Sequence, residues 1–389
     1  MIKKLLINNL DLECIHVADT KTVCINLLIS VGANCDNEKK GVAHFLEHML
    51  IEALKNDVQF ISKYRLLGTT SFDYTSFEIE CVNDMNIIEE AFIILENIIN
   101  GRYLSCDYLE TVRRDIEFEF EYLKSKTDLQ NIQAIFLKKG MPLSQPIGTK
   151  DFISKATFDD TVLFHKLNYH SASMFIFVVG PVDFNSIQNN VKSVFNDLKG
   201  KSIWQKSETR IKQFHVLKKS SIFNINSNGS KIYIENSYVH LSLYNRVVED
   251  FALMVLDNII EDYLEEYFNL KTSCNITKIR ILGKFNYICI AIKGQNILFN
   301  DSFFIKLYYF IKNILPGVMT NILNEYIDFI KHTPQLNACV ISDELRNNFL
   351  YGEPIYDKEK YLECLYNLQL FEIIDVLYCW LYQSKPINL

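Results

Sequence analysis

The feature that most constrains this chain is a short apolar segment, residues 41–50, which carries His44, Glu47 and His48. If this segment is a helix with 3.6 residues per turn, positions i, i+3 and i+4 lie on one face, so both imidazoles and the carboxylate can converge on one point. Neutral imidazole nitrogens suit Zn²⁺, and a carboxylate beside the ion can take a proton from a zinc-bound water. The spacing therefore predicts a helical zinc centre with the chemistry of amide hydrolysis.

Chance is the competing explanation of this H-x-x-E-H spacing. In a chain with 8 His among 389 residues, the pattern arises by accident roughly once in a hundred such sequences. The neighbouring residues are almost all apolar, from Val42 and Ala43 to Met49 and Leu50. Because three polar side chains on one face of an apolar helix are costly to bury without a shared task, the metal site is the better interpretation.

Composition narrows the class of protein. A chain of 389 residues with 49% hydrophobic residues can bury large cores and is expected to form two domains. The net charge of −7 argues against nucleic acid as the main partner. The ten cysteines include no C-x-x-C pair, which predicts reduced thiols. No apolar stretch is long enough to span a membrane. The apolar run at the N-terminus is too short for a signal peptide. These features predict a cytoplasmic protein.

The order of strand and helix patterns divides the chain into two similar halves. The first half, 1–200, has strand patterns at 12–17, 22–31, 70–82 and 173–182, with helical spacing between them. A polar, irregular stretch over 201–229 is the expected linker. The second half, 230–389, repeats the α+β order but has no H-x-x-E-H. We therefore expect an internal duplication in which only the N-terminal domain is catalytic.

A zinc centre needs a third protein ligand, and the helix predicted over 106–124 offers three glutamates at alternate positions. Glu119 aligns with Ile116 and Leu123 on the apolar, inward face, whereas Glu117 lies on the charged face. Glu121 is intermediate. The helical faces favour Glu119 as the third ligand, with Glu121 as the second choice and no glutamate ligand as a remaining alternative.

Two blocks of sequence resemble the pitrilysin/insulinase-type metallopeptidases, the inverted zincin family that includes mitochondrial processing peptidases and small bacterial relatives. Residues 31–50 resemble the family's first block, and Thr70-Ser71-x-Asp73-x-Thr75-x-Phe77 resembles its T-S-x-D-x-T-x-Y strand. The resemblance implies two tandem, structurally similar α+β domains, each a mostly antiparallel sheet covered by helices. It also implies one Zn²⁺ cofactor.

The resemblance assigns roles to the matching residues. His44 and His48 become zinc ligands, Glu47 the general base and Glu119 the third ligand. The strand of 70–82 becomes an edge on which an extended peptide substrate can pair. The expected substrate-binding residues are Thr70, Ser71, Asp73 and Thr75.

The second half departs from the family pattern. Residues 264–276 contain no Arg followed by Tyr, the pair that commonly holds the substrate in this family. Family members of this length usually pair with a second chain. The resemblance therefore implies the catalytic subunit of a heterodimer whose homologous partner completes the substrate contacts, with a homodimer as the alternative.

The most probable function from the sequence is a zinc endopeptidase that processes a dedicated peptide, such as the leader of a bacteriocin or peptide natural product. One alternative is a non-catalytic, peptide-binding scaffold of the same family. The other is a zinc amidohydrolase that acts on small amides rather than peptides.

Overall fold

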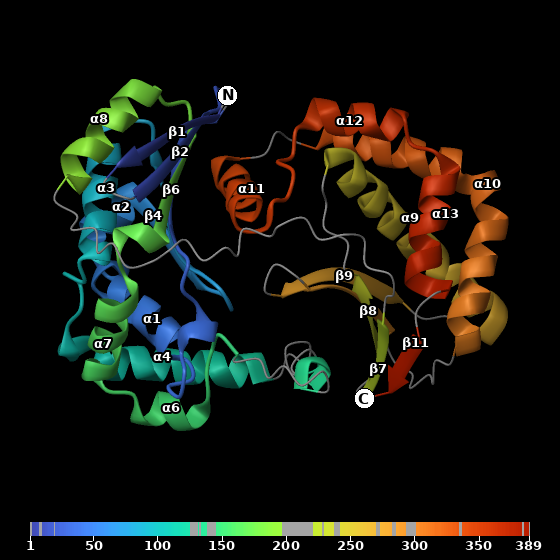
Figure 1. The fold of residues 1–389 in the computed structure, drawn as a ribbon, viewed down its shortest axis with the longest axis horizontal. Coiled ribbons are helices and arrows are strands. Elements are labelled where there is room, and N and C mark those ends of the chain that lie inside the picture. The colour runs from blue at the N-terminus through green and yellow to red at the C-terminus, as the bar shows by residue number, and fades with distance from the viewer. Residues whose placement is uncertain are drawn as a thin grey trace. The chain divides into compact units, whose positions relative to one another are not determined.

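The computed structural model describes most of the chain, and Figure 1 shows its elements along the sequence. Two compact units are present. Unit 1 comprises Met1–Thr209 and Leu336–Arg346, and unit 2 comprises Arg210–Gln335 and Asn347–Leu389. The described residues are 2–7, 10–18, 20–124, 131, 134–137, 145–196, 221–227, 229–236, 242–269, 273–281, 285–292, 301–333, 337–382 and 385–388.

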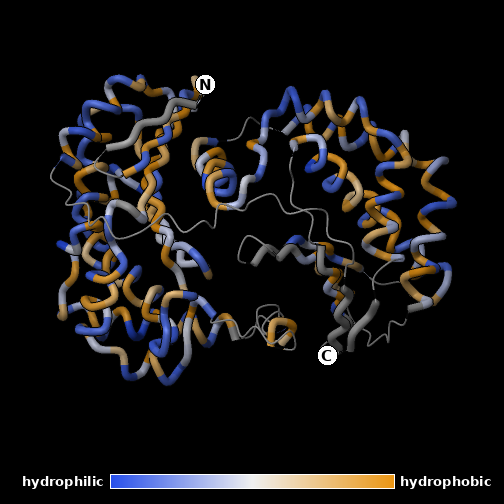
Figure 2. The backbone as a smooth tube through the Cα atoms, viewed as in Figure 1, coloured by the Kyte–Doolittle hydropathy of each residue, from blue (hydrophilic) through white to orange (hydrophobic). Residues whose placement is uncertain are grey.

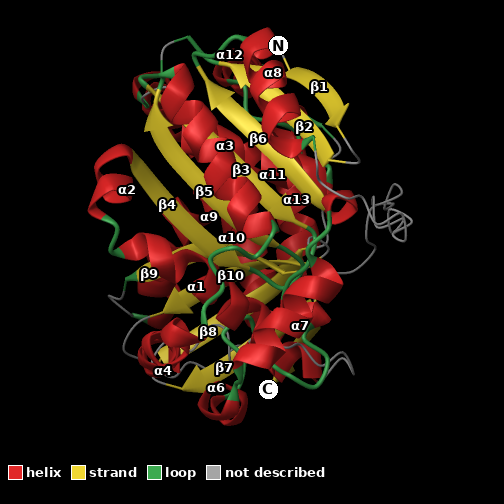
Figure 3. Cartoon of the chain, turned by 90° about the vertical axis from the view of Figure 1, so that its left-hand side faces the viewer, coloured by secondary structure: helices red, strands yellow, loops and turns green. Residues whose placement is uncertain are grey.

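Unit 1 is built on a six-stranded sheet with the strand order β1-β2-β6-β3-β5-β4, whose central strands lie side by side in Figure 3. The β2–β6 pair is parallel and the other pairs are antiparallel. The strands are β1 (Ile2–Ile7), β2 (Leu10–His16), β3 (Thr22–Ile29), β4 (Tyr64–Thr70), β5 (Thr75–Val82) and β6 (Met174–Gly180).

Helices complete unit 1, and the larger of them pack their apolar faces into its core (Figure 2). Alternate residues of β3, from Val23 to Ile29, contribute one face of the sheet to that core, where Leu46 and Leu50 of α1 and Phe92 of α3 join them. The helices are α1 (Val42–Lys55), α2 (Val58–Lys63), α3 (Met85–Ile99), α4 (Leu109–Lys124), α6 (Lys150–Lys155), α7 (Phe158–Asn168), α8 (Phe184–Phe195) and the first part of α11 (Ala338–Tyr351).

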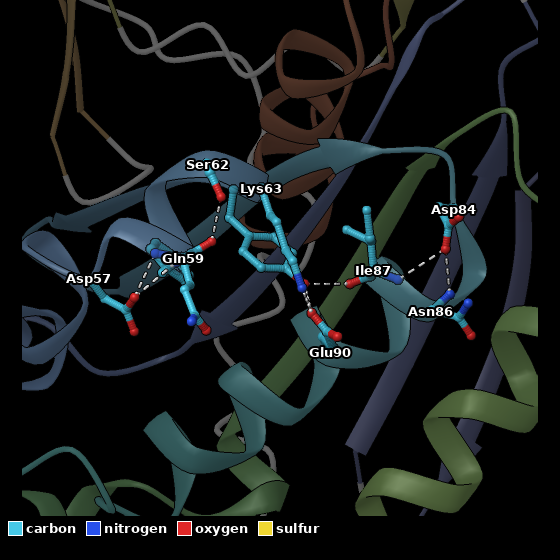
Figure 4. A network of polar contacts seen from close by, with 10 residues as sticks. Asp57, Gln59, Ser62, Lys63, Asp84, Asn86, Ile87 and Glu90 are labelled. Atoms are coloured by element: carbon cyan, nitrogen blue, oxygen red, sulfur yellow. Dashed lines mark hydrogen bonds and ion pairs between the residues drawn. The ribbon is translucent and has the colours of Figure 1, made fainter.

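Side-chain caps fix the two helices that flank the start of β4 (Figure 4). Asp57 accepts hydrogen bonds from two backbone N–H groups at the start of α2, and Asp84 does the same for α3. Glu90 of α3 then forms an ion pair with Lys63 at 2.8 Å and accepts a hydrogen bond from Tyr64 Oη at 2.7 Å. These contacts hold α3 beside the first residue of β4.

Unit 2 has a five-stranded sheet with the order β11-β7-β8-β10-β9 and its own core, to which 32 of the described residues contribute buried apolar side chains, including the fully buried Trp380. The β11–β7 pair is parallel and the other pairs are antiparallel. Its elements are β7 (Ser221–Ser227), β8 (Gly229–Asn236), α9 (Leu243–Phe268), β9 (Cys274–Ile281), β10 (Phe285–Ile292), α10 (Asp301–His332), α12 (Lys358–Tyr366), α13 (Leu370–Leu377), the π-helical turn Tyr378–Tyr382 and β11 (Lys385–Asn388).

The fold class predicted from the sequence is confirmed, because both units are mostly antiparallel sheets covered by helices. Of the expected linker 201–229, residues 201–220 lie outside the described part of the chain, and β7 begins at Ser221. Among the described residues, no single helix is long and apolar enough to cross a membrane. One bent pair, Lys358–Tyr366 with Leu370–Tyr382, meets that criterion by length and composition alone.

The strand predicted over 70–82 is wrong in its first part. Ser71 N–H donates a hydrogen bond to the Tyr74 carbonyl at 2.8 Å, so the chain turns there. Thr70 therefore ends β4 and Thr75 begins β5. Because β5 pairs with β3 on one side and β4 on the other, β5 is an interior strand of the described sheet, and β4 rather than the predicted 70–82 strand lies at this edge.

Candidate metal centre

The three motif residues lie on helix α1, and their side chains are largely buried. His44 and Glu47 are 7% and 3% exposed, and His48 is partly exposed. The helix begins after Gly41, whose φ of 110° is in the left-handed region that favours glycine. The buried Asp36 carboxylate accepts hydrogen bonds from Gly41 N–H at 2.6 Å and Ala43 N–H at 3.0 Å. Asp36 therefore fixes the first turn of the helix that carries the motif.

Helix α4 brings Glu119 to the two histidines. It runs beside α1 in Figure 1 and packs on it through a small core in which Phe45 and Met49 of α1 meet Val112 and Ile116 of α4. Ile116 lies one turn before Glu119, so the packing of α4 directs that carboxylate toward α1. The helical-face argument from the sequence therefore agrees with the observed packing.

The ligand atoms of His44, His48 and Glu119 converge. Glu119 Oε2 lies 3.6 Å from the Nε2 atom of each histidine, and the two imidazole rings have centroids 4.6 Å apart. One donor atom from each residue lies within 4.8 Å of the others. Two imidazole nitrogens and one carboxylate oxygen are the donor set of a catalytic zinc site that keeps one position open. The residues therefore fit Zn²⁺.

The protonation states of the donors also suit a metal. Burial, assisted by the neighbouring His48, lowers the pKa of His44 to about 3, so its imidazole is neutral at physiological pH. The nearby imidazoles of His48 and His44 lower the pKa of Glu119 in spite of partial burial. Neutral imidazole and ionised carboxylate are the forms that bind metal ions.

Glu121, the second choice for the third ligand, has a different environment. Its side chain is 53% exposed and its Oε1 lies 3.3 Å from Lys150 Nζ on α6. It does not belong to the cluster of donor atoms that contains His44, His48 and Glu119. The geometry thus favours Glu119.

Glu47 lies next to the donor cluster but outside it. Thr70 Oγ1, at the end of β4, donates a hydrogen bond to Glu47 Oε2 at 2.9 Å. Gly68, also on β4, makes room for the carboxylate, because a Cβ atom there would lie 2.2 Å from Glu47 Oε1. Burial raises the pKa of Glu47, while His48 and the Thr70 hydroxyl oppose that shift. A buried carboxylate with a raised pKa is suited to accept and release a proton.

The four predicted substrate-binding residues divide between two environments. The hydroxyl of Thr70 donates a hydrogen bond to Glu47, so this side chain is directed into the candidate centre. Thr75 is 1% exposed and donates a hydrogen bond to the Val31 carbonyl at 2.8 Å, so its side chain has a structural role. Ser71 and Asp73 lie in the turn between β4 and β5 and are partly exposed. Thr70 is therefore the residue of this set that contacts the motif through its side chain.

The sequence reasoning did not find Asp36, Gly68 or the contact of Thr70 with Glu47. Asp36 lies six residues before the start of α1, too far for the local pattern of a capping residue to identify it. The contacts of Gly68 and Thr70 depend on the pairing of β4 with the sheet, and the sequence did not predict β4.

Comparison with known families agrees with this geometry. The model of the family described as Insulinase (Peptidase family M16) matches residues 13–147. The model described as Peptidase M16 inactive domain matches residues 155–292. The chain belongs to the M16 peptidase family. Within this family, α1 lies in the segment that matches the first model, and β7 to β10 lie in the segment that matches the inactive domain.

Curated relatives of this M16 chain are about one quarter identical to it over about half of its length. An uncharacterized zinc protease of Rickettsia felis is 24% identical over 202 residues, which are 49% of either chain. A probable mitochondrial-processing peptidase subunit beta of Schizosaccharomyces pombe is 25% identical over 49% of this chain and 44% of its own length. The chain thus spans about half the length of the curated relatives it matches.

Solved structures share the fold at lower identity. A protease from Helicobacter pylori aligns with a TM-score of 0.71 and 16% identity, covering 100% of this chain and 99% of that one. The first half of the periplasmic protease PqqL from Escherichia coli also gives a TM-score of 0.71, with 16% identity, and covers 100% of this chain and 92% of that one. These likenesses support the M16 fold.

Proposed function

We propose that this M16 chain is a zinc-dependent endopeptidase in which His44, His48 and Glu119 hold the metal and Glu47 is the general base. The observation that carries the proposal is the convergence of Glu119 Oε2 on the two histidine Nε2 atoms, 3.6 Å from each, with Glu47 adjacent on the same helix. A bound zinc ion would polarise the scissile carbonyl and acidify water.

The protein side chains would carry the proton during hydrolysis. Glu47, held by the Thr70 hydroxyl, would accept a proton from the attacking water and deliver it to the leaving amine. Burial raises the pKa of Glu47 and so matches it to both steps. Gly68 allows the carboxylate to lie directly against β4.

An extended peptide is the substrate that best suits this site. The strand β4 ends at Thr70, beside Glu47, and it is one of the two edge strands of the described sheet. A peptide that paired with this edge would be held by main-chain hydrogen bonds close to the general base. We propose a dedicated peptide, such as a bacteriocin or natural-product leader, processed in the cytoplasm.

We also propose that the active form contains a second, homologous chain. Two facts support this: residues 264–276 lack the Arg and Tyr pair, and one relative is named as a peptidase subunit. Light scattering of the purified chain, followed by peptide cleavage with and without a co-expressed homologue, tests the idea. Full activity of a lone monomer or homodimer would contradict the heterodimer.

A peptide-library digest tests the catalytic proposal. The wild-type protein should produce new peptide termini that are absent from a parallel digest with Glu47→Gln. Binding of library peptides without cleavage, by a protein that contains no zinc, would instead support a scaffold. Hydrolysis of small amides with no peptide cleaved would support the amidohydrolase.

A further inference from the structure

Unit 1 contains a second group of potential metal ligands, formed by Cys24, Glu78 and Cys339. Their ligand atoms, two sulfurs and a carboxylate oxygen, all lie within 4.8 Å of one another. The same limit describes the three donors of the candidate catalytic centre. Cys24 is fully buried, and the other two residues are partly buried.

The three donors come from separate elements of unit 1. Cys24 lies on β3 and Glu78 on β5, while Cys339 lies in the first turn of α11, more than 250 residues along the chain from either. In the pairing of β3 with β5, Asn26 is directly opposite Glu78, and Cys24 is two residues before Asn26. Cys24 and Glu78 are therefore diagonal neighbours on one face of the sheet.

This face of the sheet is the one opposite the main core. Side chains alternate along a strand, and Val23 and Ile25 of β3 belong to the core that includes α1. Cys24 and Asn26 consequently point to the other side. The Cys24 group is thus separate from the His44 centre and is not used by the proposed peptidase reaction.

Surrounding contacts hold the three donors in place. Asn26 Nδ2 donates a hydrogen bond to Glu78 Oε2 at 3.3 Å, which orients the carboxylate as an outer-shell partner would. On α11, the Arg346 guanidinium lies 5.1 Å from the centre of the Tyr74 ring in unit 1. Asn337 Oδ1 accepts a hydrogen bond from Val340 N–H at 2.9 Å and caps the same helix.

The donor atoms of this group favour one class of metal ion. Two cysteine sulfurs and one carboxylate are a soft donor set, preferred by Zn²⁺ and other thiophilic ions over Mg²⁺ or Ca²⁺. A coordinating ion holds cysteine as the thiolate.

We propose that Cys24, Glu78 and Cys339 form a second, structural site for a thiophilic divalent cation of the zinc class. The ion would join β3 and β5 to the first turn of α11 and so fix the segment Leu336–Arg346 on unit 1. A closed structural zinc site has four ligands, and a water molecule can supply the fourth here.

Cobalt substitution in a His48→Ala background tests this proposal independently of peptidase activity. The variant removes one ligand of the catalytic centre, so the metal that remains reports the second site. We expect about one equivalent of Co²⁺ per chain, with the near-ultraviolet charge-transfer absorption of thiolate-to-cobalt bonds. Adding Cys339→Ser should abolish this absorption, whereas Cys364→Ser, on α12 and outside the group, should leave it unchanged.

Two further measurements guard against a variant that fails to fold. Glu78→Gln keeps both sulfurs, so it should retain the thiolate absorption but require more Co²⁺ to reach half-saturation. Alkylation of the metal-free protein, denatured without reductant so that the buried Cys24 is accessible, should modify both Cys24 and Cys339. A His48→Ala protein without thiolate absorption, or a Cys24–Cys339 disulfide in that assay, would overturn the proposal.

Discussion

In unit 1, the segment from β3 through α1 to β4 brings Glu47 into contact with Thr70. In unit 2, the segment from β8 through α9 to β9 brings Glu249 and Asp250 into contact with Lys278. The two segments correspond to each other because their strands have equivalent positions in the two sheets, in the order β3-β5-β4 in unit 1 and β8-β10-β9 in unit 2. Lys278 Nζ lies 3.3 Å from Glu249 and 2.5 Å from Asp250. In the described residues of unit 1, Glu47 has a hydroxyl partner and no ion pair.

This difference shows how one architecture can support two roles. A buried carboxylate paired with a lysine has its charge compensated, and removal of the lysine would leave that charge unpaired. A buried carboxylate with only a hydroxyl partner has a raised pKa and can exchange its proton. Unit 2 also lacks the histidine pair of α1, so its helix α9 provides packing and charge neutralisation without metal chemistry.

The largest effect expected from a single substitution is that of His48→Ala. Removing one of three protein ligands should release the catalytic zinc and abolish peptide cleavage, which metal analysis and a cleavage assay would measure together. His332→Ala, on an exposed residue at the end of α10, is the matched control in unit 2 and should retain both. Equal zinc loss in both variants would contradict the claim that the metal is bound by unit 1 and not by unit 2.

Glu119→Gln and Glu121→Gln compare two glutamates of the same helix. Glu119→Gln should weaken zinc binding by more than the roughly 10–100-fold typical of outer-shell changes, because it removes an anionic ligand. Glu121→Gln changes an exposed side chain that contacts Lys150 and should bind zinc as the wild type does. Competition with a zinc chelator measures both affinities. The reverse order would make Glu121 the ligand.

Lys278→Met tests the ion pairs of unit 2. Glu249, with a side chain only 5% exposed, would lose its cation, and we expect a loss of about 1–3 kcal/mol in the free energy of unfolding. Peptide cleavage by the folded protein should be unchanged. Lys360→Met, which removes an exposed pair with Asp357, should change stability by less than about 0.5 kcal/mol. Urea denaturation distinguishes these outcomes.

The smallest effect expected is that of Thr70→Val. The lost hydrogen bond to a carboxylate is worth about 1.5 kcal/mol, which corresponds to roughly tenfold in kcat/KM. Because the Thr70 hydroxyl lowers the pKa of Glu47, its removal should raise that pKa and move the acidic limb of the pH–rate profile to higher pH. Thr70→Ser should restore the wild-type profile. An unchanged limb in Thr70→Val would show that Glu47 does not depend on this contact.

The candidate metal centre could be predicted from the sequence because its parts are local. His44, Glu47 and His48 lie within one helical turn, and the apolar neighbours of Glu119 on α4 indicate its direction. Each inference required only the 3.6-residue period.

The remaining features depend on contacts distant in sequence. The edge position of β4 requires the pairing of 64–70 with 75–82, and the 71–74 turn has no glycine or proline to mark it. The approach of Gly68 to Glu47 follows from that pairing. Cys24 and Cys339 are brought together only because part of α11 packs with unit 1, which no local pattern indicates.

Parallel measurement of zinc content and peptide cleavage in Glu47→Gln tests the central claim most directly. Because Glu47 lies outside the donor cluster, the variant should contain as much zinc as the wild type. Loss of the general base should lower kcat by about 10²–10⁴-fold. Cleavage at the wild-type rate, or loss of zinc together with activity, would contradict the assignment of Glu47 as the general base beside a metal held by His44, His48 and Glu119.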